Sequence, residues 1–186
     1  MSGKNGSGVT IDRRTALLGF VGCCLASPVF AGAEEELPAK GDSLVYADGD
    51  LEGKPIVLAS LKEAEPVLAT AVDPSGIQRT ESRFAKIVLI RVPEAEIDED
   101  TKPHTAENVV ALSAICTHQG CTVNGWDPAN KALLCFCHGS EFVPGEGGRV
   151  AKGPARKRIP ILPLAKNEKG EGMVAGGFLG KPGPGA

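Results

Sequence analysis

The sequence predicts an all-β fold, and three observations lead to that prediction. Short segments rich in Val, Ile and Leu recur along the chain, bounded by Gly, Pro, Asp or Asn. The 24 glycines and 14 prolines follow no period, which is typical of tight turns between short strands. No apolar repeat of 3.6 residues lasts long enough to indicate a helix. With 186 residues, 42% of them apolar, the chain is expected to bury one core in a single domain.

Eight segments of the chain are expected to form strands. The predicted segments are 43–46, 55–58, 67–72, 85–92, 109–115, 132–135, 159–164 and 173–175. Residues 60–65 are expected to form at most one helical turn. The acidic residues at 94–100 are interpreted as a solvated loop, because unpaired charges avoid burial. Residues 145–148 are interpreted as a turn, since a phosphate-binding loop needs a different spacing and a following helix.

The first 33 residues look like an export signal of the twin-arginine type. Arg13 and Arg14 precede an apolar stretch at 16–33, which ends in small residues. Cleavage after Ala33 is one interpretation, and retention as a membrane anchor is the alternative, because 18 helical residues rise about 27 Å against a hydrocarbon core of about 30 Å. We therefore expect the protein on the periplasmic side, either soluble or attached to the cytoplasmic membrane by this segment.

Local composition predicts where the folded domain begins and ends. Residues 34–41 are charged and contain a proline, which indicates a linker before a folded domain at 42–180, and residues 181–186 are expected to be a flexible tail. The net charge of -3 predicts no basic surface for a phosphate backbone, so nucleic acid is not an expected partner. Removal of residues 1–33 would reduce the six cysteines to four, all within one stretch.

Two short motifs carry the chemistry. The first reads CTHQGC and begins at Cys116, and the second reads CFCHGS and begins at Cys135. Each offers a cysteine thiolate with an imidazole close behind it, Cys116 with His118 and Cys135 with His138. Structural zinc also takes two cysteines and two histidines, but zinc fingers pair Cys with Cys and His with His along the sequence. One of each per motif favours a two-iron site in which one iron takes both cysteines and the other takes both histidines.

The two motifs resemble the ligand loops of the Rieske iron-sulfur proteins. The resemblance includes the Gly-Ser pair after the second histidine and the residues at 153–155, which are similar to the proline loop over the cluster in that family. It implies the Rieske fold, an antiparallel β-sandwich base with a small inserted cluster-binding subdomain at about 107–158. It also implies one [2Fe-2S] cluster, held by Cys116, His118, Cys135 and His138.

The resemblance implies roles for the residues around the ligands as well. Cys121 and Cys137 would form a disulfide that joins the two loops, and Ser140 would donate a hydrogen bond to a bridging sulfide and raise the reduction potential. Phe142 stands where the family commonly has a tyrosine that bonds a ligand sulfur, so a somewhat lower potential is expected. Three further residues are expected around the ligands: Gly120, Gly139 and Pro154.

Electron transfer is the function that the resemblance predicts, in one of two assemblies. The cysteine pair favours the iron-sulfur subunit of a bc1-like quinol:cytochrome c oxidoreductase, with a c-type cytochrome as partner and quinol reached through a cytochrome b-like subunit. Gln119, where quinol-oxidising members usually have leucine, favours the alternative, a periplasmic Rieske subunit or carrier for another oxidoreductase, similar to the small subunit of arsenite oxidase. Only His104 remains for a second iron, which excludes an oxygenase, and no complete substrate site is expected on this chain alone.

Overall fold

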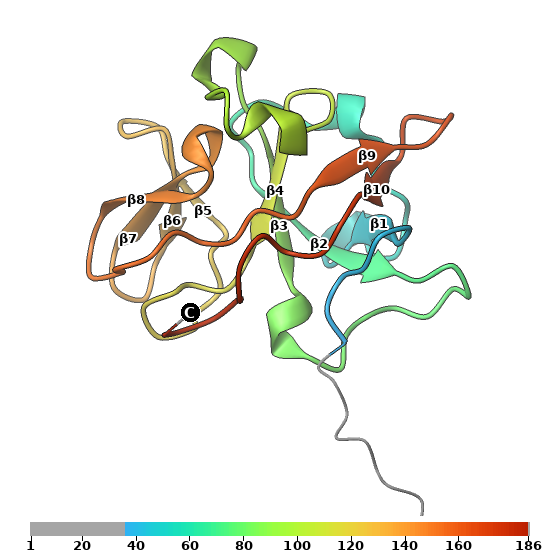
Figure 1. Ribbon diagram of the computed structural model, residues 1–186, viewed down its shortest axis with the longest axis horizontal. Helices are drawn as coiled ribbons and strands as arrows, with labels where there is room; N and C mark the ends of the chain where they lie inside the picture. Colours follow the sequence, from blue (N-terminus) through green and yellow to red (C-terminus); the bar gives the residue numbers. More distant parts are fainter. Residues whose placement is uncertain (1–35, 186) are drawn as a thin grey trace, which may run out of the picture. The chain divides into compact units, whose positions relative to one another are not determined.

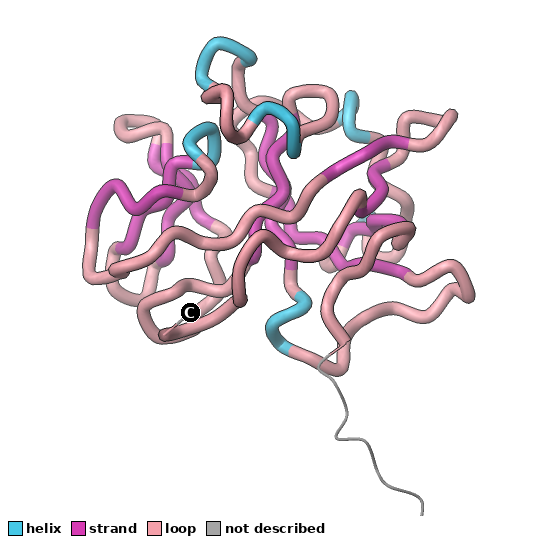
Figure 2. Tube along the Cα trace, in the orientation of Figure 1, coloured by secondary structure: helices cyan, strands magenta, loops and turns pink. Residues whose placement is uncertain are grey.

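The computed structural model describes residues 36–185, drawn in colour in Figure 1. The predicted export signal and the start of the predicted linker lie outside the described residues. The described part consists of strands, loops and short 3-10 helices (Figure 2), and none of its helices is long and apolar enough to span a membrane. The 3-10 helices are η1 (Gly49–Leu51), η2 (Leu58–Ser60), η3 (Arg83–Ala85), η4 (Glu94–Glu96), η5 (Lys102–His104) and η6 (Pro144–Glu146). The predicted all-β class is confirmed.

A six-stranded antiparallel sheet forms the base of the fold, in the order β4-β3-β2-β1-β10-β9. Its strands are β1 (Ser43–Tyr46), β2 (Val67–Val72), β3 (Ile87–Arg91), β4 (Val109–Ser113), β9 (Leu164–Lys166) and β10 (Gly172–Val174). The segment that leads into β9 pairs with β4: the Ser113 amide donates to the Pro160 carbonyl at 2.8 Å, and the Leu162 amide donates to Ala111 at 2.9 Å. The sheet therefore closes on itself, and the outer edge of β4 is covered.

Strands β3 and β4 are buried on both faces. Successive side chains of a strand point to opposite faces, so each strand contributes to two cores. One core lies inside the closed sheet and draws residues from all six strands; from β3 and β4 it takes Ile87, Leu89, Val109 and Ala111. The other core lies outside the closed sheet and takes Val88, Ile90, Val110 and Leu112. Burial on both faces explains why these strands are continuous apolar runs.

A second sheet, antiparallel and four-stranded, covers that outer core in the order β5-β6-β7-β8. Its strands are β5 (Gly125–Asp127), β6 (Ala132–Cys135), β7 (Ser140–Val143) and β8 (Arg149–Lys152), and all lie between β4 and β9 in the sequence. Leu133 and Phe142 are fully buried in the outer core. An antiparallel base with a smaller inserted subdomain is thus confirmed.

Two predicted strands differ from the structure. Segments 55–58 and 159–164 form only isolated bridges before β9 begins, at Val45–Pro55, Val57–Glu171 and Leu112–Ile161. Pro55, Pro160 and Pro163 interrupt them, because proline has no amide to donate to a ladder. The helical turn expected at 60–65 is instead the 3-10 helix η2, which ends at Ser60.

Candidate metal centre

Three loops meet at one end of the inserted sheet. The first loop (116–121) follows β4, the second loop (136–139) joins β6 to β7, and the third loop (153–158) follows β8. The two predicted ligand motifs form the first two of these loops. A short apolar hairpin between β6 and β7 fixes the second loop, since Cys135 and Ser140 face each other in the register.

The first and second loops share one backbone turn. In each, the amide of a glycine donates to the carbonyl of the cysteine four residues earlier, from Gly120 to Cys116 at 2.8 Å and from Gly139 to Cys135 at 3.0 Å. Both glycines have positive φ, +77° and +70°, a left-handed conformation that other residues adopt only at a cost. The glycines therefore allow each loop to turn tightly after its cysteine.

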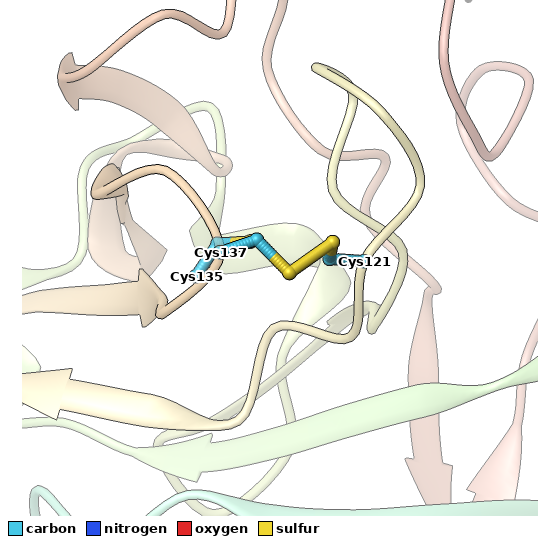
Figure 3. A group of neighbouring side chains, drawn as sticks. All are labelled: Cys121, Cys135 and Cys137. Carbon is cyan, nitrogen blue, oxygen red and sulfur yellow. A yellow bond between two sulfur atoms is a disulfide. The ribbon is translucent and has the colours of Figure 1, made fainter.

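A disulfide between Cys121 and Cys137 joins the first loop to the second (Figure 3), with 6.5 Å between the Cα atoms. The sulfur atoms of these two cysteines and of Cys135 all lie within 4.8 Å of one another. Because two of the three sulfurs are bonded together, only Cys135 of this group has a thiol for a metal ion. The disulfide is the one that the sequence resemblance implied.

The structure brings the other four predicted residues into two like pairs. Cys116 and Cys135 are free thiols, 2% and 1% exposed, and their side chains are hydrogen-bonded to each other. The rings of His118 and His138 lie 4.7 Å apart between centroids and nearly perpendicular, at 89°. His118 is half-buried and His138 is exposed, so the thiols are inside and the imidazoles face outward.

The surroundings of Cys135 act on its thiol in opposite directions, and on balance the pKa of this thiol is raised from its ordinary value. Burial is the main cause that raises the pKa of the Cys135 thiol, while a backbone hydrogen bond from Cys137 lowers it. The neighbouring Cys116 thiol raises this pKa further, and a second backbone hydrogen bond, from His138, lowers it. Two amides that donate to one sulfur stabilise a thiolate, and such hydrogen bonds tune the potential of iron-sulfur clusters. Two thiols, two imidazoles and these amides together fit a [2Fe-2S] cluster.

The third loop is attached to both of the others. The Ala155 amide donates to the Ser140 hydroxyl at 3.2 Å, and the Thr117 hydroxyl donates to the Lys157 carbonyl at 2.6 Å. A Cβ added at Gly153, where φ is +87°, would lie 2.4 Å from the Gly139 carbonyl oxygen. Nothing in the residues around Thr117 indicates this contact, since its partner lies 40 residues away.

The other residues expected around the ligands occupy different surroundings. Phe142 is fully buried in the outer core, next to the second loop on β7, and Pro154 is exposed on the third loop. Ser140 is fully buried, and because its oxygen accepts from Ala155, its own proton is available to another acceptor.

Residues from outside the subdomain brace the first loop. Arg83 donates to the Gly120 carbonyl at 3.1 Å and lies over the Phe84 ring, 5.1 Å from its centroid. The chain end also reaches this region: a Cβ at Gly120 would lie 3.4 Å from Pro184, and one at Gly183 would lie 2.4 Å from the Phe84 ring. Gly183 and its neighbour Pro182 are buried, although they belong to the segment expected to be a flexible tail.

Comparison with known proteins places the chain in a family. A family model described as the Rieske [2Fe-2S] domain matches residues 68–163. A Haloferax mediterranei protein, provisionally named respiratory nitrate reductase subunit Rieske, is 30% identical over 80% of this chain and 64% of that protein. The cytochrome bc1 complex Rieske iron-sulfur subunit of Streptomyces lividans is 32% identical over 60% of this chain and 69% of that subunit.

A solved structure is similar as well, the soluble domain of the Rieske protein II (soxF) from Sulfolobus acidocaldarius. It is 21% identical, with a TM-score of 0.36, over 48% of this chain and 61% of that chain. The chain spans only part of its relatives: 64% of the Haloferax protein, 69% of the Streptomyces lividans subunit and 25% of the Corynebacterium glutamicum bc1 subunit. Because the family model covers more than half of the chain and includes all three loops, this chain belongs to the Rieske [2Fe-2S] domain family, whose cofactor is a [2Fe-2S] cluster.

Proposed function

We propose that Cys116 and Cys135 bind one iron of the cluster and that His118 and His138 bind the other. The separation of the four side chains into a buried thiol pair and an outward imidazole pair supports this assignment. When bound, a Rieske cluster takes up and releases a single electron. The protein holds the thiol pair away from solvent, directs two amides at the Cys135 sulfur and leaves the imidazole edges accessible.

The function we propose is one-electron transfer as the iron-sulfur subunit of a bc1-like quinol:cytochrome c oxidoreductase. Relatives named as a cytochrome bc1 complex Rieske iron-sulfur subunit and as a ubiquinol-cytochrome c reductase iron-sulfur subunit support it, and so does the disulfide between Cys121 and Cys137. The partners would be a c-type cytochrome and a cytochrome b-like subunit that brings quinol to the exposed ring of His138. The chain would be exported by the twin-arginine route to the periplasmic side, with residues 16–33 either cleaved or kept as an anchor.

Two observations favour a second candidate, a Rieske subunit of another oxidoreductase. The Haloferax protein with a nitrate reductase name matches 80% of this chain, against 60% for the Streptomyces lividans bc1 subunit. Gln119 is exposed at the tip of the first loop, so a polar amide stands on the surface where quinol-oxidising members usually present leucine.

The ligand assignment is tested with two of the three histidines of the chain. His138→Ser should abolish the cluster, while His104→Ser, in η5, should leave two irons and two acid-labile sulfides per chain. Iron, sulfide and zinc analysis with EPR of the reduced protein measures both. A normal EPR signal from the His138 variant would disprove the assignment, and zinc without sulfide in the wild type would disprove the iron-sulfur function.

The two assemblies differ in the potential that they require. An EPR-monitored redox titration should give a potential in the upper part of the roughly -150 to +300 mV Rieske range if the partner is quinol. A value near or below zero would favour the second candidate.

A further inference from the structure

Positive charge gathers around the three loops. Arg156 and Lys157 belong to the third loop, and both are exposed. Arg83 donates to the Gly120 carbonyl of the first loop, and Lys181 lies beside the buried Pro182–Gly183 segment that packs near that loop. These four residues are named the cationic rim.

Negative charge is missing from the same place. None of the three loops contains Asp or Glu, although the whole chain has a net charge of -3. Within residues 36–185, the ion pairs use other cations, and no residue of the cationic rim takes part in one. The rim charges therefore form no ion pair within the described residues, and their field extends into solvent over about one Debye length.

An apolar side chain stands among these charges. Phe136 lies in the second loop between Cys135 and Cys137, and it is 71% exposed, the highest value among the large apolar residues of the described range 36–185. Interfaces between proteins are enriched in aromatic residues and arginine, and their central aromatic anchors are surrounded by polar groups. The loops thus combine an aromatic anchor with unpaired cations.

We propose that this end of the molecule docks an acidic c-type cytochrome, with the cationic rim facing its carboxylates and Phe136 in the apolar centre. The inference rests on the proposed function, since the partner would receive the electron here. The reduced [2Fe-2S] cluster loses one electron and the ferric haem gains it, with no other bond made or broken. A protein is favoured over an anionic membrane because the net charge of the chain is negative and the cations border the loops themselves.

The test measures binding rather than turnover. Calorimetry of the oxidised holoprotein with an acidic and a basic c-type cytochrome is done at about 0.01 M and about 1 M ionic strength, where the Debye lengths are about 30 and 3 Å. The acidic cytochrome should bind at least about tenfold more weakly at high salt. The basic cytochrome should bind more weakly than the acidic one at low salt. Equal affinities, or no salt dependence, would overturn the proposal.

A charge-reversal pair locates the surface. The double variant Arg156→Glu with Lys157→Glu should raise the Kd for the acidic cytochrome about tenfold or more at low salt. The control, Lys54→Glu with Lys169→Glu, changes net charge equally at two exposed lysines away from the three loops and should change the Kd less than about threefold. Equal effects of both double variants would overturn the docking surface.

Cluster content and vesicle binding are measured as well, to distinguish a failure of the proposed function from a failure of the docking surface. Iron content and EPR of every variant report the cluster, so a wild type without a cluster refutes the proposed function, while a normal cluster with salt-independent binding refutes only the docking surface. Flotation with phosphatidylserine vesicles tests the membrane alternative. Vesicle binding that depends on Arg156 and Lys157, without binding of the acidic cytochrome, would overturn the proposal.

Discussion

The backbone amide of Ala155 donates a hydrogen bond to the hydroxyl of Ser140 across 3.2 Å. Ala155 belongs to the third loop and Ser140 is the first residue of strand β7, where it is fully buried. The bond orients the serine, because its oxygen accepts from one side and its proton is left for an acceptor on the other. In the proposed site that acceptor is a cluster sulfide.

Ser140→Ala should therefore have two effects. It should lower the reduction potential, because a donor to the cluster is lost, and lower the free energy of unfolding by about 1 to 3 kcal/mol, because the Ala155 amide loses its partner. Redox titration and denaturant unfolding measure these effects. Ser60→Ala, which removes an exposed serine-to-carbonyl bond elsewhere, should change stability by less than about 0.5 kcal/mol and leave the potential unchanged. An unchanged potential in Ser140→Ala would contradict the orientation.

Removal of the disulfide should weaken the site without abolishing it. Cys121→Ser with Cys137→Ser opens a link with a sequence separation of 16, which the loop-closure estimate values at about 3 kcal/mol. The double variant should contain a cluster that bleaches faster on heating, followed by visible absorption. The wild type treated with a thiol reductant should approach the variant, and identical bleaching rates in all samples would refute a stabilising role.

Thr117→Val should loosen the attachment of the third loop to the first. The variant keeps the shape of the side chain but loses the bond to the Lys157 carbonyl, at a cost of about 1 kcal/mol, and should lose its cluster faster. Thr105→Val is the matched control, because its hydroxyl also donates to a carbonyl but at an exposed site in a different loop. Equal rates of cluster loss in the two variants would mean that the Thr117 contact does not help to retain the cluster.

Gly153→Ala should disturb the second loop through backbone contact. The added Cβ would meet the Gly139 oxygen at 2.4 Å and the Ser140 Cα at 2.6 Å, so the loops must separate. Gly76→Ala has a similar φ, +92° against +87°, but nothing lies within 4 Å of its Cβ. The control should cost about 1 kcal/mol for the backbone conformation alone, and Gly153→Ala should cost more and reduce the iron content. If the two variants are equally stable and equally loaded with iron, the close packing of the loops is not required.

The sequence predicted strands best where apolar residues dominate. β1, β2 and β6 begin and end at the predicted residues, because each is a run of apolar side chains between turn residues. β5, β7 and β8 were not predicted. β7 begins with Ser140 and Glu141, whose buried polar atoms are paired with Ala155 for the serine and with Asn130 and Lys152 for the glutamate. β8 is mostly exposed. These strands depend on partners that local sequence does not display.

In the candidate metal centre, too, the sequence predicts local features but not contacts between distant segments. The cysteines, histidines and turn glycines are close together in sequence, so their spacing could be interpreted directly. The bonds from Arg83 to Gly120 and from Thr117 to Lys157 span 37 and 40 residues, and nothing in either local segment indicates the other. The net charge of -3 likewise gave no indication of the cationic rim, since a sum over the chain carries no information about position.

The hydrogen bond between Ser113 and Pro160 brings the two ends of the inserted subdomain together. The chain leaves the base at the end of β4 and returns to it within hydrogen-bonding distance of the same place, 2.8 Å between the Ser113 nitrogen and the Pro160 oxygen. Everything between them begins and ends at neighbouring points, as in inserted domains that tolerate replacement. We therefore expect the inserted subdomain to tolerate change independently of the base. Its loops can lengthen, shorten or be replaced by those of a relative while the six-stranded sheet keeps its strand order.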